Sequence, residues 1–126
     1  MLNIKPKIKI MHSSAEDGQH PNARGFSTTE EISLSRFVHF EIPYQDDEDL
    51  STKLKKLGVV GKFLLTELST IPGIMEIYFS RYSITIWKGN AFEWEDIEDS
   101  IITALKRIFG PNAEQVKIVC VNGLRN

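Results

Sequence analysis

The sequence has a single cysteine, Cys120, among its 126 residues. One thiol forms no internal disulfide and supplies neither a CxxC pair nor a four-cysteine cluster, so we expect no resident metal or other cofactor. No apolar run approaches the roughly 20 residues that cross a bilayer. The first residues, in which lysines alternate with apolar residues, do not resemble a signal peptide. We therefore expect a cytoplasmic protein with no membrane partner.

An excess of charge of either sign is also missing. The chain has 15 Lys and Arg residues against 17 Asp and Glu residues, a formal net charge of −2. Proteins that wrap a nucleic-acid backbone usually carry a strongly basic face, so we expect no nucleic-acid partner. Hydrophobic residues make up 41% of the chain and charged residues 25%, ordinary values for a globular fold. No repeat or linker divides the sequence, and we expect one domain over residues 1–126.

Six segments carry the alternating or β-rich pattern of strands. They cover residues 7–12, 24–32, 36–42, 74–80, 83–88 and 115–121. In the fourth segment, the alternation places Met75, Ile77 and Phe79 on one face. Only a short turn separates the fourth segment from the fifth, which predicts an antiparallel hairpin. The last segment is apolar on both faces, which is typical of a covered strand.

Two helices are expected between these strands. The first covers residues 59–70 and ends at Pro72 and Gly73; its buried face is predicted to hold Val60, Leu64, Leu68 and Ile71, with Phe63 beside them. The second has apolar residues at intervals of three and four: Trp94, Ile97, Ile101, Leu105 and Ile108. Asn90 followed by Glu93 predicts a capping box before the second helix, and Gly110 followed by Pro111 predicts its end.

The resulting order is β-β-β-α-β-β-α-β. We predict an α+β fold of two layers, in which a mainly antiparallel sheet of about six strands carries two helices on one face. The last six elements also follow the β-α-β-β-α-β order of ferredoxin-like folds, which we keep as the alternative topology.

Two irregular segments are expected, at residues 13–22 and 43–56. In the second, a run of acidic residues precedes several lysines; the acidic residues are Asp46, Asp47, Glu48 and Asp49. Such a run is usually a solvated loop or a loop that leads into a helix. It lacks the alternating ligands and internal glycine of an EF-hand, so it predicts no calcium site.

Few residues suggest chemistry. Cys120, near the end of an apolar strand, is better explained as a small buried residue than as a nucleophile. His12, His20 and His39 have no metal-binding spacing, and His39 alternates with exposed-face residues of its strand. Gly61 and Lys62 lack the rest of a phosphate-binding loop.

Acidic and aromatic residues offer two further possibilities. The acidic residues between Glu93 and Asp99 match the positive end of a helix dipole, which explains them without catalysis. Tyr78, Tyr82 and Trp87 could stack on single-stranded bases, but no basic groove surrounds them in the sequence. No combination of nucleophile, base and oxyanion donors emerges. We therefore assign no catalytic, metal or cofactor residues and expect a protein that is not an enzyme.

Several short motifs occur in an order that is similar to the order in one known protein family. An IPGV-like turn is matched by residues 71–74 and a VFFG-like strand by residues 77–79. An ITVTK-like strand is matched by residues 84–88, and a DWE-like helix start by residues 94–97. Upstream, residues 20–26 resemble the family's NPNxxKF-like opening. This ordered set of motifs resembles the N-terminal domain of the Nfu/NifU iron–sulfur scaffold proteins, and the resemblance covers about residues 20–109.

The resemblance implies a role in iron–sulfur cluster assembly, and the family is associated with iron ion binding. Family members hold the cluster through a CxxC pair in a second domain, and these 126 residues contain no such pair. Ser80 and Arg81 also stand where the family has Gly and Pro. We therefore expect a non-catalytic accessory domain that contacts scaffold proteins or recipient apoproteins, through an exposed strand edge for example. The alternative is a regulatory or small-ligand-binding module unrelated to iron.

Overall fold

The computed structural model describes residues 8–13, 21–110, 113–118, 120–121 and 124–125, and the side chains of residues 21–110. The elements in chain order are β1 (Ile8–Ser13), β2 (Ala23–Thr28), β3 (Val38–Glu41), α1 (Leu50–Leu68), β4 (Ile74–Phe79), β5 (Ser83–Lys88), α2 (Trp94–Phe109), β6 (Ala113–Ile118), β7 (Cys120–Val121) and β8 (Leu124–Arg125).

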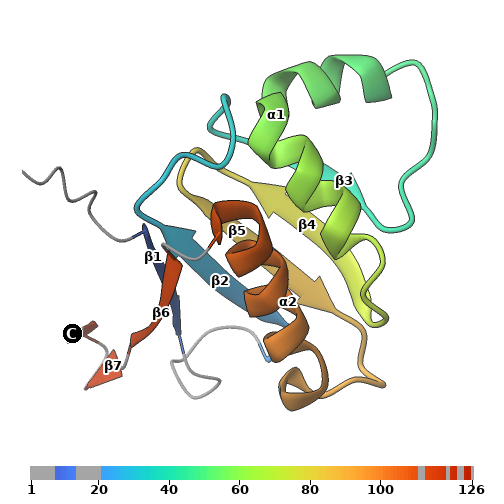
Figure 1. Ribbon diagram of the computed structural model, residues 1–126. Coiled ribbons are helices and arrows are strands. Elements are labelled where there is room, and N and C mark those ends of the chain that lie inside the picture. The colour runs from blue at the N-terminus through green and yellow to red at the C-terminus, as the bar shows by residue number, and fades with distance from the viewer. Residues whose placement is uncertain (1–7, 14–20, 111–112, 119, 122–123, 126) are drawn as a thin grey trace, which may run out of the picture.

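The strands form one main sheet in the order β3-β4-β5-β2-β1-β6. Every pair in it is antiparallel except β1 with β6, which is parallel. Both helices lie on the same face of this sheet (Figure 1). The α+β class, the mainly antiparallel pairing and the β4–β5 hairpin predicted from the sequence are confirmed.

The prediction of a mainly antiparallel sheet of about six strands needs a correction, because the unit that carries the two helices has four strands. Strands β2 to β5 alternate with the two helices as β-β-α-β-β-α, and this antiparallel unit has four strands. β1 and β6 lie outside the unit, at its β2 edge. The ferredoxin-like alternative is wrong, because α1 connects β3 and β4, which are antiparallel neighbours. Periodicity identifies strands but not which strand pairs with which.

The predicted last strand, residues 115–121, is divided. β6 ends at Ile118, and β7 pairs with β8 in a separate two-stranded sheet. Cys120 lies in β7, and its side chain is outside the described part of the chain. Its burial stays a prediction.

Helix α1 begins earlier than predicted, at Leu50 rather than near Val59. Gly58, with φ 75° and ψ −173°, interrupts the helical conformation and divides α1 into two segments. The acidic and basic residues before Gly58 are followed and interrupted by leucines at helical spacing. Leu57 lies in the core, and Leu50 and Leu54 pack against it. The prediction of an irregular segment up to residue 56 is therefore wrong from Leu50 onward.

The buried face of α1 is rotated relative to the prediction. Leu64 and Leu68 are buried as expected, and so is Leu65. Phe63, however, is 64% exposed. The buried residues of the second segment are Gly61, Leu64, Leu65 and Leu68.

One strand also departs from its predicted face. The pairing of β4 with β5 shifts register between Ile74 and Glu76, as in a β-bulge. The shift buries Ile74 and leaves Met75 52% exposed, so Met75 does not share the face of Ile77 and Phe79.

Helix α2 has the predicted buried stripe, with Trp94, Ile97, Ile101 and Leu105 all in the core and Ile108 packed against it. The capping box is displaced by three residues. Glu93 is the N-cap, and its backbone N–H donates to the Asp96 carboxylate, 3.1 Å away. Gly110, with φ 75°, ends the helix as expected.

Candidate interaction surface

The face of the sheet opposite the helices is not covered by a further layer of the described residues (Figure 1). Alternation along each strand sends one set of side chains to the core and the other to this open face. Polar, small and aromatic side chains make up the second set: Ala23, Gly25 and Ser27 from β2, His39 and Glu41 from β3, Glu76 and Tyr78 from β4, and Ser83, Thr85 and Trp87 from β5.

An aromatic cluster lies where β3 and β4 meet on the open face. His39 and Tyr78 are opposite each other in the β3–β4 pairing, and their rings stack with centroids 4.4 Å apart. The Phe37 ring lies 5.7 Å from that of Tyr78, and Phe37 is 63% exposed. The prediction that His39 lies on the exposed face of its strand is thus confirmed.

Glu76 connects the polar atoms of this cluster. Its Oε1 lies 2.9 Å from His39 Nε2 and accepts a hydrogen bond of 3.4 Å from the Tyr78 hydroxyl. Desolvation of the phenol raises the pKa of Tyr78 above the ordinary value of 10.0, and the charge and hydrogen bond of Glu76 raise it further, with a smaller contribution from Glu41. The neutral phenol is therefore the stable form of Tyr78 next to this carboxylate.

A shallow hollow of about 420 Å³ adjoins the cluster, lined by Phe37, Tyr78, Thr85 and Trp87 among others. Two of the three aromatics considered for base stacking, Tyr78 and Trp87, meet here, whereas Tyr82 lies in the hairpin turn and is 51% exposed. Arg36 is the cation that lines the hollow. One arginine does not make the basic groove that nucleic-acid backbones require.

The free edge of β3 borders this face. Within the part of the chain that the structure describes, β3 is the terminal strand of the sheet and pairs with β4 alone. The backbone N–H of Ile42 donates to the carbonyl of Met75, 2.8 Å away. Because backbone groups alternate in direction along a strand, the N–H and C=O groups of Phe40 also face β4, and those of His39 and Glu41 face outwards.

A second hollow, of about 320 Å³, lies between this edge and the segment that leads to α1. Its lining includes Glu41, Tyr44, Asp47 and Lys53. The acidic run of residues 46–49 is exposed and leads directly into α1, as one of the two interpretations of the sequence predicted. Asp47 Oδ1 accepts a hydrogen bond from the backbone N–H of Asp49, 3.0 Å away.

The acidic residues at the start of α2, and the pair Gly61 and Lys62, have structural roles or positions in the fold. Asp96 belongs to the capping box and Glu98 pairs with Arg24, so the acidic start of α2 is used for helix capping and packing. Gly61 and Lys62 lie inside α1 and not in a loop.

Of the three histidines, His39 is the one whose side chain is described. His39 pairs with Glu76, the His12 side chain is not among those described, and His20 is outside the described residues. Within the described residues, no three His, Cys, Asp or Glu side chains are placed to hold a metal ion, and no helix is long and apolar enough to cross a membrane.

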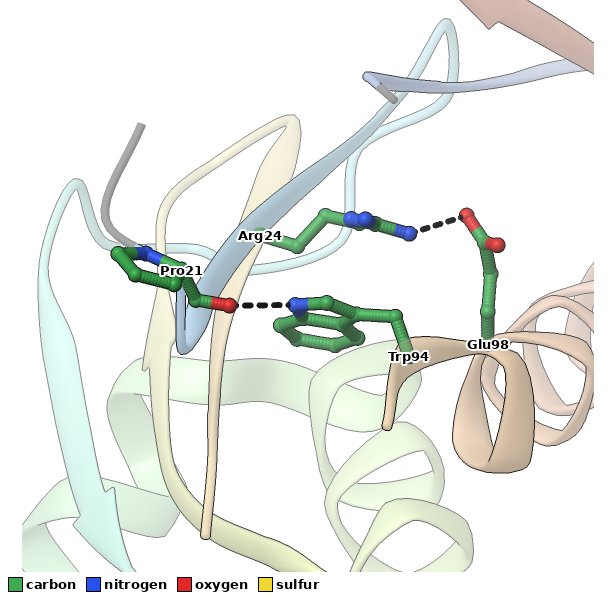
Figure 2. A network of polar contacts seen from close by, with 4 residues as sticks. All are labelled: Pro21, Arg24, Trp94 and Glu98. Carbon is green, nitrogen blue, oxygen red and sulfur yellow. Dashed lines mark hydrogen bonds and ion pairs between the residues drawn. The ribbon is translucent and has the colours of Figure 1, made fainter. Parts of the chain in front are cut away.

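Sequence reasoning missed a polar network at the start of α2 (Figure 2). The Arg24 guanidinium is buried and donates to Glu98 Oε1 at 2.9 Å. Beneath it, the indole N–H of Trp94 donates to the Pro21 carbonyl at 2.8 Å. Only the alternation of Arg24 with the buried Phe26 could have indicated that this cation faces inwards.

A second cation extends this network. Lys88, only 8% exposed, has its Nζ 3.0 Å from Asn22 Oδ1 and 6.0 Å from the centroid of the Trp94 ring. The Asn22 amide donates in turn to Asn90 Oδ1. Three of the motif blocks that carry the family resemblance, residues 20–26, 84–88 and 94–97, therefore meet here. Their shared role is to fix α2 on the sheet, and the surfaces available to other molecules lie elsewhere, on the open face and the β3 edge.

The geometry defines a two-layer α+β domain with an open, aromatic sheet face and a free strand edge. Comparison with known proteins agrees with that class. The solution NMR structure of a NifU-like protein from Saccharomyces cerevisiae is similar, with a TM-score of 0.51 and 20% identity, over 85% of this chain and 82% of that chain. The crystal structure of protein SAV1430 from Staphylococcus aureus is similar with a TM-score of 0.52 and 15% identity, over 77% of this chain and 98% of that chain.

No family model matches the sequence, and no curated protein matches it significantly. The resemblance to the Nfu/NifU N-terminal domain is thus confirmed as a likeness of fold. The aromatic cluster, the β3 edge and the buried network are features of this chain's own residues.

Proposed function

We propose that this chain is a non-catalytic accessory domain of iron–sulfur cluster assembly that acts through contacts with scaffold proteins or recipient apoproteins. The observation that carries the proposal is the fold likeness to a NifU-like protein over most of both chains. The sequence motifs that resemble the Nfu/NifU N-terminal domain support it independently, because they depend on residue identities and not on the fold.

The open face of the sheet supports a role in binding proteins. Phe37 is a large apolar side chain that remains mostly exposed, next to Tyr78 and His39. Aromatic residues are enriched where proteins bind each other, because their rigid rings bury much area at little entropic cost. With one cysteine in the chain, a cluster would have to be held by other molecules.

The test is a strain from which the gene is deleted, assayed for several iron–sulfur enzymes and for a matched enzyme without iron. We expect the iron–sulfur activities to fall, the iron-free activity to be unchanged, and anaerobic affinity capture of the intact chain to recover cluster-assembly proteins. Normal iron–sulfur activities together with no such proteins in the capture would exclude this function and favour the regulatory module.

Anaerobic titration of the purified chain with iron and sulfide tests the non-catalytic, cluster-free part of the proposal. We expect no stable sulfur-to-iron charge-transfer band from the monomer. A stable band and stoichiometric iron in the monomer would contradict the accessory role, because the chain would then hold a cluster itself.

A further inference from the structure

The outward edge of β3 offers backbone groups on which another strand can pair. Within the described residues no strand pairs with this edge, and the alternation along β3 aims the backbone groups of His39 and Glu41 away from the sheet. Such groups are a template on which an extended chain can add a further strand. Next to them lies the hollow of about 320 Å³, which gives the side chains of an added strand a place to enter.

The charged residues around this edge favour a binding partner of one charge sign. Glu41 and Asp47 line the hollow with one lysine, Lys53, whose ammonium lies 5.5 Å from the centroid of the Phe40 ring. Asp46, Glu48 and Asp49 extend the negative charge along the same segment, and Glu76 adds to it on the open face. An incoming strand therefore meets a surface with excess negative charge.

A second copy of this chain does not suit the edge. The β3 strand of a second copy, Val38–Glu41, brings the carboxylate of Glu41 and no Lys or Arg, so it would not neutralise the acidic residues at this edge. A segment that carries Lys or Arg suits the same strand better, because the carboxylates beside β3 then neutralise the positive charges of that segment.

We propose that the free edge of β3 binds an extended, basic segment of a partner protein by strand addition, with Lys or Arg side chains of that segment paired to Glu41 and Asp47. The proposal rests on the proposed function in taking the chain as a protein-binding domain. It also gives the acidic run a role, the selection of basic partners.

The experiment is a titration of the intact, ¹⁵N-labelled chain with an acetylated and amidated hexapeptide of alternating Lys and Val, followed by NMR. We expect shifts of the His39 and Glu41 amide signals and slower hydrogen exchange at both amides. The same peptide with Glu in place of Lys is expected to bind at least about tenfold more weakly, as is the Lys peptide to the Glu41→Lys/Asp47→Lys variant.

Glu95→Lys/Asp99→Lys is the matched control, because it changes the net charge equally at exposed positions of α2. Its affinity for the Lys peptide should stay within about twofold of that of the unmodified chain. Equal losses in both double variants would overturn the proposal, since the peptide would then respond only to the overall charge.

Strand addition is tested by N-methylation of alternate peptide bonds. Only one of the two alternating sets of peptide N–H groups faces β3 in an added strand. One methylated peptide should therefore keep its affinity and the other should lose it. Equal affinity of the two peptides, or a dimer of the chain alone with protected His39 and Glu41 amides, would overturn the proposal.

These results are separable from those for the proposed function. Loss of iron–sulfur enzyme activity in the deletion strain, with no peptide binding at β3, would remove the strand-addition proposal alone. The opposite result would remove the link to cluster assembly alone: the basic peptide binds, only one of its two N-methylated forms keeps the affinity, and iron–sulfur enzyme activities in the deletion strain are normal.

Discussion

The carbon at the centre of the Arg24 guanidinium lies 4.7 Å from the centroid of the Trp94 ring (Figure 2). Arg24 comes from β2 and Trp94 is the first residue of α2, so this contact joins segments far apart in the sequence. A guanidinium over an indole face is stabilised by the ring's electron density, more strongly where water is excluded. The contact therefore determines where α2 begins to pack on the sheet.

Replacing Trp94 with alanine is expected to lower the free energy of unfolding by about 3–5 kcal/mol. The indole is only 8% exposed, and its removal leaves a cavity beneath Arg24 and a Pro21 carbonyl without its donor. Denaturant melts provide the measurement. Trp94→Phe keeps most of the packing and should lose clearly less. A loss below about 1 kcal/mol in the alanine variant would show that Trp94 does not anchor α2.

Removing the carboxylate partner of a buried cation should lower the free energy of unfolding more than removing the carboxylate partner of an exposed cation. Glu98→Gln leaves the Arg24 guanidinium, with its side chain 5% exposed, without a carboxylate, and we expect a loss of about 1.5–3 kcal/mol. Glu67→Gln is the matched control, because its partner Arg107 is 63% exposed. That change should cost about 0–1 kcal/mol. Equal losses in thermal or chemical melts would mean that burial does not strengthen the Arg24 pair.

Much of the fold could be predicted because local patterns determine it. The stripe from Trp94 to Leu105 has a strong helical period, and the β4–β5 hairpin follows from two strands separated by a short turn. Pairing across a helix leaves no such local signal. The opposition of His39 and Tyr78 depends on how α1 returns the chain to the sheet, so the aromatic cluster and its Glu76 could not be foreseen.

The errors have similar causes. The helical residues between Leu50 and Leu57 are hard to recognise in the sequence, because their many charged side chains resemble a solvated loop and only three leucines mark the buried face. Met75 was assigned to the wrong face because a bulge changes the alternation within one strand. Arg24 was not expected inside, since a cation is buried only when tertiary structure brings it a partner such as Glu98.

The kink in α1 requires a glycine at position 58. Gly58 has φ 75° and ψ −173°, a backbone conformation that residues with a side chain rarely adopt, and an added Cβ would lie 2.8 Å from Leu34 Cγ. Gly58→Ala should therefore destabilise the fold by about 1–3 kcal/mol. Gly25→Ala is the control. Among the described residues, no atom outside Gly25 and its two chain neighbours lies within 4 Å of the point that its Cβ would occupy, so this change should be neutral or slightly stabilising. Similar stabilities of the two variants would contradict the strain at Gly58.

Ionisation of Tyr78 gives a prediction in alkaline solution. Desolvation, together with Glu76 and Glu41, raises the pKa of Tyr78 above the ordinary value of 10.0. The folded chain then holds the phenolic proton at a pH where the unfolded chain has released it. The stabilisation linked to this proton is fully present below the ordinary pKa and is lost as the pH rises through the raised value.

The pKa is measured by NMR titration of the chain with labelled tyrosine rings, with Tyr78→Phe to assign the signal. We expect Glu76→Gln to lower the pKa of Tyr78 towards 10.0, because the charge of this carboxylate and the hydrogen bond it accepts both favour the neutral phenol. Glu95→Gln, on the exposed side of α2, serves as the control and should leave this pKa unchanged. If the pKa of Tyr78 did not change in Glu76→Gln, the contact between Glu76 and the Tyr78 hydroxyl would not exist in solution.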